Sequence, residues 1–521
     1  MDSSVKKPLI ITVALLLFIP QGKIYSQTTE NLTPEHWAYE ALDYLNAKMY
    51  FSELHYSTKP FNRINVAKAI QQIFKKMAHN QYAATSYELY LLHRLEHEFR
   101  YEIQLIEKPD RRGVLLESAT RAIGASEKNF NEHLRGIQHL SAAVHLGKKA
   151  AIFNRFEVDT DGFNDPDHHG RVEWKSLAGD MPNAYALFSL PWFRVLVGRD
   201  ALNWGPSSFG SLILSTHAPT LDMVAVKGRF WKCEFSAFNA FLSRSNALED
   251  SLNVNKYLSG HRISFKLNDR FTFGISETVL YGGPNHSLNY MYANPLIPYY
   301  LTDVIMVENE ENNVLVGADF SWIFKNGMRG YGELLIDEYY YEEDYANKTA
   351  FTAGLELAAP FSIDGAFLTC EYTRIQNWTY NYIEKSRWNK YTYFRGMLGH
   401  PLGPDADRIL ISGRYYLGHH FHAKGLFSYT RNGEGDIQTP MIFTNGWSDA
   451  FLKDSFPSGI VEENSNVRLR LEYSPNVNLF VAAQAEYNHV ANAGHVPSIS
   501  EEEWFFNVDV TWRIRYFIDV Q

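Results

Sequence analysis

Residues Phe506–Tyr516, FNVDVTWRIRY, alternate apolar and polar side chains along their whole length. In an extended strand this two-residue period places all the polar side chains on one face and all the apolar ones on the other. The same alternation recurs in shorter form at 262–267 (RISFKL) and at 467–473 (VRLRLEY). One face of the predicted sheet is therefore strongly polar, while the other face carries almost no charge.

The lengths of the strands and of their connections favour a membrane barrel over a soluble β-sandwich, which would also alternate. Strand after strand runs for roughly 9–11 residues, the length that crosses a bilayer at a tilt, and a sheet in lipid must close on itself because lipid offers no hydrogen bonds. Long and short connections alternate from Ser243 to Asp364, as in outer-membrane barrels. The residues after Arg112 suffice for roughly 18 strands, although the alternation breaks down between Gln376 and Gly418.

The N-terminus has the features of a secretory signal peptide. Lys6 and Lys7 precede an apolar run from Leu9 to Ile19, and Ser26 offers a small residue for cleavage. The apolar run is too short for a membrane anchor, which needs about 20 residues. We therefore expect residues 1–26 to be removed and the mature protein to leave the cytoplasm.

Between the signal peptide and the sheet, the apolar period is helical. Thr33-Pro34 and Asn62 are typical helix starts, and Thr85 with Glu88 has the spacing of a capping box. The sequence predicts three amphipathic helices, which form a bundle over residues 27–112 with polar outer faces. The fold class is therefore mainly β: a large closed antiparallel transmembrane β-barrel over 113–521, preceded by an N-terminal α-helical bundle.

Composition limits the classes of partner. Charged residues make up 21% of the chain and its mean hydropathy is −0.29, values that exclude a helical membrane protein. The formal charge of −10 argues against nucleic acid, because phosphate binding needs a cationic surface. Aromatic residues reach 15%, which fits a barrel with aromatic girdles or a β-protein that handles sugars. Cys233 and Cys370 lie far apart in strand-like runs and are expected to be small buried or lipid-facing residues.

A segment between two apolar arms, 195–231, carries a more specific signal. Gly198-Arg199-Asp200, Asn203-Trp204-Gly205-Pro206 and Gly210–Ser215 together resemble the signature of the Wzi family of capsule-assembly outer-membrane proteins. Further matches follow in the same order at 281–283, 294–295, 354–356, 371–374 and 399–408. The resemblance covers most of the mature chain.

This resemblance implies a lectin-like protein of the cell outer membrane. Its barrel would be closed at the periplasmic end by the helical bundle, and its long loops would be extracellular. It would attach capsular polysaccharide or exopolysaccharide to the cell surface without polymerising or exporting it. The resemblance supplies no sugar-binding residues.

Candidate sugar contacts come from the residue types that suit sugars. Aromatic rings pack on the C–H faces of a sugar, while carboxylates, amides and guanidinium groups bind its hydroxyls. Both types occur in the segment above and in loops at 337–344, at 376–387 and around Trp447. The candidate polysaccharide-binding residues are Arg199, Asp200, Asn203, Trp204, Tyr340, Glu342, Trp378, Tyr380 and Trp447. The competing interpretation is structural: an ion pair in the lumen and a turn anchor in the first group, and loop packing or an interfacial girdle in the others.

No arrangement of residues indicates catalysis, a metal site or a cofactor. The adjacent carboxylates Glu342, Glu343 and Asp344 would point to opposite faces of a strand, whereas a glycosidase needs two opposed carboxylates. The His419–His422 cluster is explained more simply by a tight turn. Two functions compete with a surface lectin: a diffusion channel, because the lumen face is polar, and a barrel enzyme acting on glycan or lipid. The barrel is expected to be monomeric, with outer-membrane lipid around it.

Overall fold

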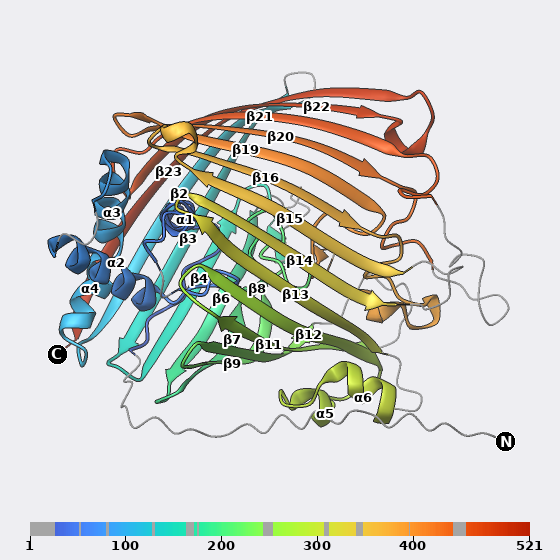
Figure 1. Ribbon diagram of the computed structural model, residues 1–521, viewed down its shortest axis with the longest axis horizontal. Helices are drawn as coiled ribbons and strands as arrows, with labels where there is room; N and C mark the ends of the chain where they lie inside the picture. The colour runs from blue at the N-terminus through green and yellow to red at the C-terminus, as the bar shows by residue number, and fades with distance from the viewer. Residues whose placement is uncertain are drawn as a thin grey trace.

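The computed structural model describes residues 27–51, 54–79, 83–127, 131–162, 171–174, 177–242, 254–306, 312–339, 347–394, 396–440 and 455–520. The predicted signal peptide lies outside the described residues. Two parts follow one another along the chain: helices between residues 38 and 107, and strands of the barrel from Arg112 onwards. In Figure 1 the helices lie at one end of the barrel, beside the C-terminus.

In the part of residues 27–112 that the structure describes, the bundle has four helices: α1 (Ala38–Ala47), α2 (Arg63–Ala78), α3 (Ser86–Glu98) and α4 (Arg100–Glu107). The predicted capping box is confirmed, because the Glu88 N–H donates to Thr85 Oγ1 and the Thr85 N–H donates to Glu88 Oε2. Asn62 is the N-cap of α2, also as predicted.

Two of the helix predictions were wrong in detail. The first helix begins at Ala38 rather than near Pro34. Residues 33–36 form a turn instead, in which the His36 N–H donates to the Thr33 carbonyl at 3.1 Å, and the His36 ring accepts from the Ala38 N–H at 3.2 Å. The predicted third helix is divided at Phe99, which ends α3 and precedes α4. Its buried ring packs under the Arg63 guanidinium, 4.7 Å from the ring centroid.

Within the described residues, eighteen strands form the closed wall of the barrel, all paired antiparallel. In chain order they are β2 (Arg112–Glu127), β3 (Asn131–Leu146), β4 (Ala150–Asp159), β6 (Leu177–Ser189), β7 (Phe193–Asp200), β9 (Leu221–Phe230), β10 (Cys233–Leu242), β11 (Val254–Lys266), β12 (Phe271–Pro284), β13 (Asn312–Lys325), β14 (Met328–Glu338), β15 (Lys348–Ala358), β16 (Ala366–Ile375), β19 (Ala406–Gly418), β20 (Phe421–Asn432), β21 (Glu462–Tyr473), β22 (Leu479–Ala491) and β23 (Ser500–Val520). The first and last of these close the wall, in register from Arg112 opposite Val520 to Ser126 opposite Phe506. The short β5 (Arg171–Trp174) pairs with β6.

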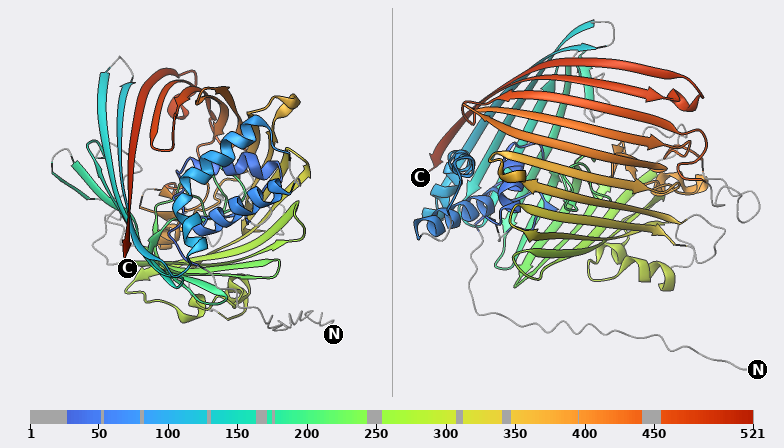
Figure 2. Two further views of the ribbon diagram at one scale, coloured as in Figure 1. Left: turned by 90° about the vertical axis from the view of Figure 1, so that its left-hand side faces the viewer. Right: turned by 45° about the horizontal axis from the view of Figure 1, so that its top comes forward.

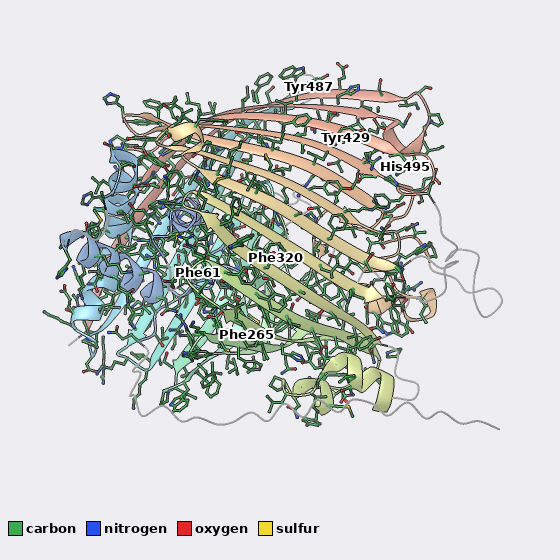
Figure 3. All side chains as sticks on the ribbon, in the orientation of Figure 1. Phe61, Phe265, Phe320, Tyr429, Tyr487 and His495 are labelled. Atoms are coloured by element: carbon green, nitrogen blue, oxygen red, sulfur yellow. The ribbon has the colours of Figure 1, made fainter. Side chains whose placement is uncertain are left out.

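The two faces of the wall follow the predicted alternation. On β23, Trp512 and Ile514 are 57% and 50% exposed on the outer face, whereas Asp509 and Arg513 on the inner face are 4% and 7% exposed. Aromatic side chains such as Phe320 extend from the outer face of the strands (Figure 3). None of the helices in the described ranges has both the length and the apolar character needed to cross a membrane.

Short helices occur in the connections: α5 (Tyr290–Ala293), α6 (Tyr299–Met306), η1 (Pro360–Ser362), η2 (Glu384–Asn389) and η4 (Ala493–His495). The break in loop alternation between Gln376 and Gly418 now has an explanation. A single long connection runs from β16 to β19, and it contains η2 and the small hairpin β17 (Thr392–Tyr393) and β18 (Gly396–Met397). Its buried residues Tyr380, Tyr391 and Leu398 belong to the core cluster inside the barrel.

A second segment, residues 201–220, leaves the wall after β7 and enters the barrel before β9 begins. Within it, β8 (Asn203–Trp204) pairs with β1 (Thr58–Lys59) from the bundle part of the chain. Gly205 has φ +155°, and a Cβ there would lie 2.5 Å from Glu333 Oε1 on the wall. The bundle lies across one opening of the barrel (Figure 2, left), so the lumen is occupied by three remote parts of the chain.

Candidate functional site

The ion pair predicted for Arg199 exists, but it lies on the outer face of the barrel. Arg199 Nη2 and Nε contact Asp222 Oδ2 and Oδ1 at 2.6 and 2.8 Å. Arg199 has the same strand parity as the exposed Val197, and Asp222 has that of the exposed Val224. The prediction of a lumen ion pair was wrong because both side chains alternate with the inward-facing residues and so lie on the outer face.

Asp200 and Asn203 act as anchors inside the barrel. The buried Asp200 carboxylate accepts hydrogen bonds from the side-chain amides of Asn31 and Asn183, both at 2.8 Å. The Asn203 amide donates to the Gly205 carbonyl at 3.1 Å, and its oxygen accepts from Ser211 Oγ at 3.1 Å. Both side chains therefore fix the path of the inward segment.

Trp204 is a core residue of the inward segment. It is 1% exposed, and its ring meets that of Phe238 edge to face, with 5.3 Å between centroids. The small Gly260 on β11 leaves room for it, since a Cβ there would lie 3.1 Å from the indole. This arrangement supports the structural interpretation of Trp204.

The long connection 376–405 binds the inward segment from the other side. Tyr380 is fully buried; its hydroxyl donates to the Leu212 carbonyl at 2.5 Å, and its ring stacks on that of Tyr391. Trp378 is also buried and has a left-handed backbone, with φ +66°. The remaining candidates, Tyr340, Glu342 and Trp447, lie outside the described residues.

Two wall carboxylates complete the attachment of the inward segment, and neither was predicted. Glu333 Oε2 accepts from the Leu212 N–H at 2.8 Å. Glu371 Oε2 accepts from Ser207 Oγ at 2.6 Å and from the Tyr331 hydroxyl at 2.7 Å. Both are isolated acidic residues on the polar face of a strand, so the sequence gives no sign of their partners.

The opposite side of the lumen remains open. Two adjoining cavities of about 360 and 520 Å³ lie between the bundle and the strands β2–β4 and β19–β23. Both are lined by the bundle residues His36 and Trp37 and by the wall residues Arg121 and Arg470. These side chains make this a polar space inside the barrel.

A ladder of ion pairs borders this open space; we call Arg121, Arg468, Arg470, Glu486 and Asp509 the polar ladder. All of them except Glu486 line one or both of the two cavities. Arg468 binds both carboxylate oxygens of Glu486, at 2.8 and 2.9 Å. Arg470 and Arg121 share Asp509 Oδ2, at 3.0 and 2.8 Å. Arg468, Arg470 and Asp509 belong to the alternating stretches noted above, so the sequence did predict their common face. Arg121 on β2 and Glu486 on β22 lie outside those stretches, and their place in the ladder was not predicted.

The bundle is attached to the wall by a buried ion network around Glu98. The Glu98 carboxylate contacts Arg513 and Arg515 on β23 at 2.5 Å each, and Arg63 and His36 at 3.2 Å each. Despite burial, these charges hold the pKa of Glu98 well below its usual range. Burial lowers the pKa of His36 to about 4, although the Glu98 charge opposes the shift. Buried ion pairs thus hold the bundle against the wall of the barrel.

Comparison with known proteins gives the family. A family model described as capsule assembly protein Wzi matches residues 79–498, most of the chain. The chain belongs to the Wzi capsule assembly family. Its barrel is accordingly of the outer-membrane type. A search of curated proteins finds no match.

Solved structures share the fold. One of them is Wzi from Escherichia coli, an outer membrane protein involved in group 1 capsule assembly that is described as a carbohydrate-binding β-barrel. It is 14% identical to this chain, and the match covers 90% of this chain and 97% of that one, with a TM-score of 0.58. OccD3 (OpdP) from Pseudomonas aeruginosa is 10% identical over 77% of this chain and 91% of that one, with a TM-score of 0.46. At these identities the likeness to E. coli Wzi shows the fold alone.

Proposed function

We propose that this Wzi-family protein is a non-catalytic, lectin-like attachment point for capsular polysaccharide or exopolysaccharide on the cell surface. The observation that carries the proposal is the occupied lumen of a capsule-assembly barrel. The inward segment and the connection 376–405 fill one side of the lumen, and the bundle lies across one end. A polymer cannot be threaded through such a barrel, but it can be held at its open mouth.

The polar ladder supports binding of a hydroxyl-rich polymer. Arg468 is 42% exposed and already oriented by Glu486, and Asn466 donates to the same carboxylate at 2.7 Å. Charged groups held in this way form strong hydrogen bonds to sugar hydroxyls or carboxylates without a large ordering cost. Tyr340, Glu342 and Trp447 stay proposed contacts on the evidence of the sequence.

The same proposal orients the protein. The bundle end, with its polar helix surfaces, faces the periplasm, and the long connections on the opposite end face outward, after cleavage of the signal peptide 1–26. The apolar outer face is in contact with membrane lipid around a monomeric barrel. The bundle 27–112 and the barrel 113–521 are the two functional parts.

The experiment that tests attachment is deletion of the gene in an encapsulated strain. We expect polysaccharide to move from the cell pellet to the medium while total polymer stays constant. Loss of polymer synthesis would contradict the proposal.

Binding itself is tested with purified protein and purified polysaccharide. Replacing Arg468 with Gln removes one charged donor, which we expect to weaken the Kd about ten- to a hundred-fold, because such a hydrogen bond is worth roughly 1.5–3 kcal/mol. Arg431→Gln is the matched control: Arg431 lies on the neighbouring strand, is 38% exposed and pairs with Asp407, but it has the parity of the outer face. Equal loss in both variants would refute a role for the lumen side.

A diffusion channel is the second candidate, and the polar ladder is the observation in its favour. Charged side chains from β2, β21 and β23 follow the open side of the lumen as far as the bundle. Steady conductance of the full-length protein in a planar bilayer would support a channel.

A further inference from the structure

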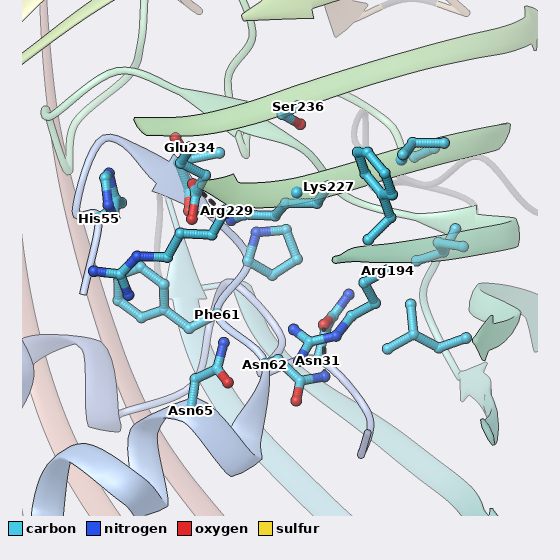
Figure 4. A pocket seen from close by; sticks show the side chains of 18 of the residues that line it. Asn31, His55, Phe61, Asn62, Asn65, Arg194, Lys227, Arg229, Glu234 and Ser236 are labelled. Atoms are coloured by element: carbon cyan, nitrogen blue, oxygen red, sulfur yellow. Dashed lines mark hydrogen bonds and ion pairs between the residues drawn. The ribbon is translucent and has the colours of Figure 1, made fainter. Parts of the chain in front are cut away.

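A third cavity, which we call the rim cavity, lies between the bundle and the wall at the bundle end of the barrel. It measures about 370 Å³ and is bounded by the starts or ends of β7, β9 and β10 and by α2. Figure 4 shows Arg194 of the wall beside the bundle-side residues Asn31 and Asn62, whereas Lys227 extends toward Glu234 and Arg229 toward Phe61. The volume is within the roughly 300–1,000 Å³ of small-molecule sites.

The rim cavity is cationic although the chain as a whole has a net charge of −10. Its cationic lining residues are Lys59, Lys68, Arg194, Lys227 and Arg229, whereas its carboxylates are Asp200 and Glu234. Asp200 is already bound by two amides, and Glu234 is paired with Lys227 at 3.1 Å. The positive charges therefore exceed the negative ones within a confined space.

Lys68 on α2 is the lining cation for which the excess of positive charge is least compensated. It makes no hydrogen bond or ion pair with any residue in the described ranges, although it is half-buried. Burial and the nearby positive charge of Arg194 both lower its pKa. Two cations that line the same partly buried cavity repel, and a bound anion would remove that repulsion.

The rim of the cavity is aromatic and apolar. Trp192, Phe193, Phe230 and Trp231 line it, and Trp231 is 85% exposed. Trp side chains concentrate where a membrane protein passes from lipid to water, with the ring among the headgroups. The cationic interior thus opens next to the level of lipid headgroups.

We propose that the rim cavity binds a phosphate ester, with the headgroup of a membrane phospholipid as its main source. The phosphate would lie between Lys68 and Arg194, because charge-assisted hydrogen bonds from Lys and Arg suit phosphate oxygens. The glycerol and acyl chains would lie against the aromatic rim. The site is separate from the polar ladder, and the inference does not depend on polysaccharide binding.

Native mass spectrometry of the full-length protein in detergent tests the inference with three probes: dihexanoyl phosphatidylglycerol, inorganic phosphate, and dioctanoylglycerol, which lacks a phosphate. The test variant is Lys68→Gln with Arg194→Gln. The matched control is Lys149→Gln, an exposed lysine at the same end of the barrel but outside the cavity. Heat-modifiable migration in gel electrophoresis confirms that each variant remains folded.

We expect one phosphatidylglycerol per wild-type protein and per Lys149→Gln protein, with at least a ten-fold weaker Kd in the double variant. Weak binding of inorganic phosphate with tight binding of the lipid identifies the lipid headgroup as the source, while phosphate binding without lipid binding identifies a free phosphate ester. Equal binding of phosphatidylglycerol by wild type and double variant, or equal binding of dioctanoylglycerol, would overturn the inference.

Discussion

Neutralising Glu98 should release the bundle from the barrel. Its side chain is fully buried and contacts Arg513, Arg515, Arg63 and His36 at 2.5 to 3.2 Å. Glu98→Gln keeps the shape but leaves three arginines with one carboxylate fewer. Removing one partner from a buried ion pair costs about 3–5 kcal/mol, which corresponds to about a hundred- to a several-thousand-fold increase in the undocked population.

Hydrogen exchange of the backbone amides in α2, α3 and α4, read by mass spectrometry in detergent, measures that population. The matched control is Glu96→Gln on the same helix. Glu96 is 50% exposed and pairs with His93 at 3.3 Å, and a surface pair of this kind contributes about 0–1 kcal/mol. If the exchange rates of the two variants are alike, the buried network does not hold the bundle, and the reasoning is wrong.

Three other predictions concern the bundle and the inward segment. Burial lowers the pKa of His36 and His55 to about 4, below the unfolded value of 6.5, so each histidine takes up a proton when the bundle undocks below pH 6.5. The stability of docking, measured by hydrogen exchange, should be constant above pH 6.5 and fall as the pH falls toward 4. Replacing both histidines with Gln should remove this pH dependence. Gly205→Ala should lower the gel-shift melting temperature, because the new Cβ meets Glu333, and an unchanged midpoint would count against the tight fit. Full-length protein should carry no steady current in planar bilayers, whereas deletion of 33–107 should produce one; equal steady current through both would favour the channel.

The wall of the barrel was predictable because its signal is local. The two-residue period is present within single strands, at 262–267 and 467–473, and the closing strand has it from Phe506 to Tyr516. The same alternation would have placed Arg199 correctly, because it follows Val195 and Val197, whose side chains are on the outer face. The error of placing this pair in the lumen came from treating its charge as stronger evidence than its parity.

The path of the inward segment was not predictable, because its partners are remote. Residues 201–220 contain the Gly, Pro and Asn of an ordered turn region, which fits an external loop equally well. What brings the segment inside is Glu333 binding the Leu212 N–H and β1 pairing with β8, contacts that span more than a hundred residues. For the same reason, Trp204 and Tyr380 were candidates for sugar binding but are buried in the core.

The lumen therefore divides into two sides with different consequences for mutation. On one side Glu371 and Glu333 are buried and hold backbone and hydroxyl groups of the chain itself, so a variant such as Glu371→Gln should lower thermal stability and change polysaccharide binding only as folded protein is lost. On the other side Arg468 is accessible, so Arg468→Gln should weaken binding while the melting temperature changes little. Measuring melting temperature and Kd for both variants separates the two roles. Loss of affinity by fully folded Glu371→Gln protein would show that the filled side contacts the polymer, and the division of the lumen would be wrong.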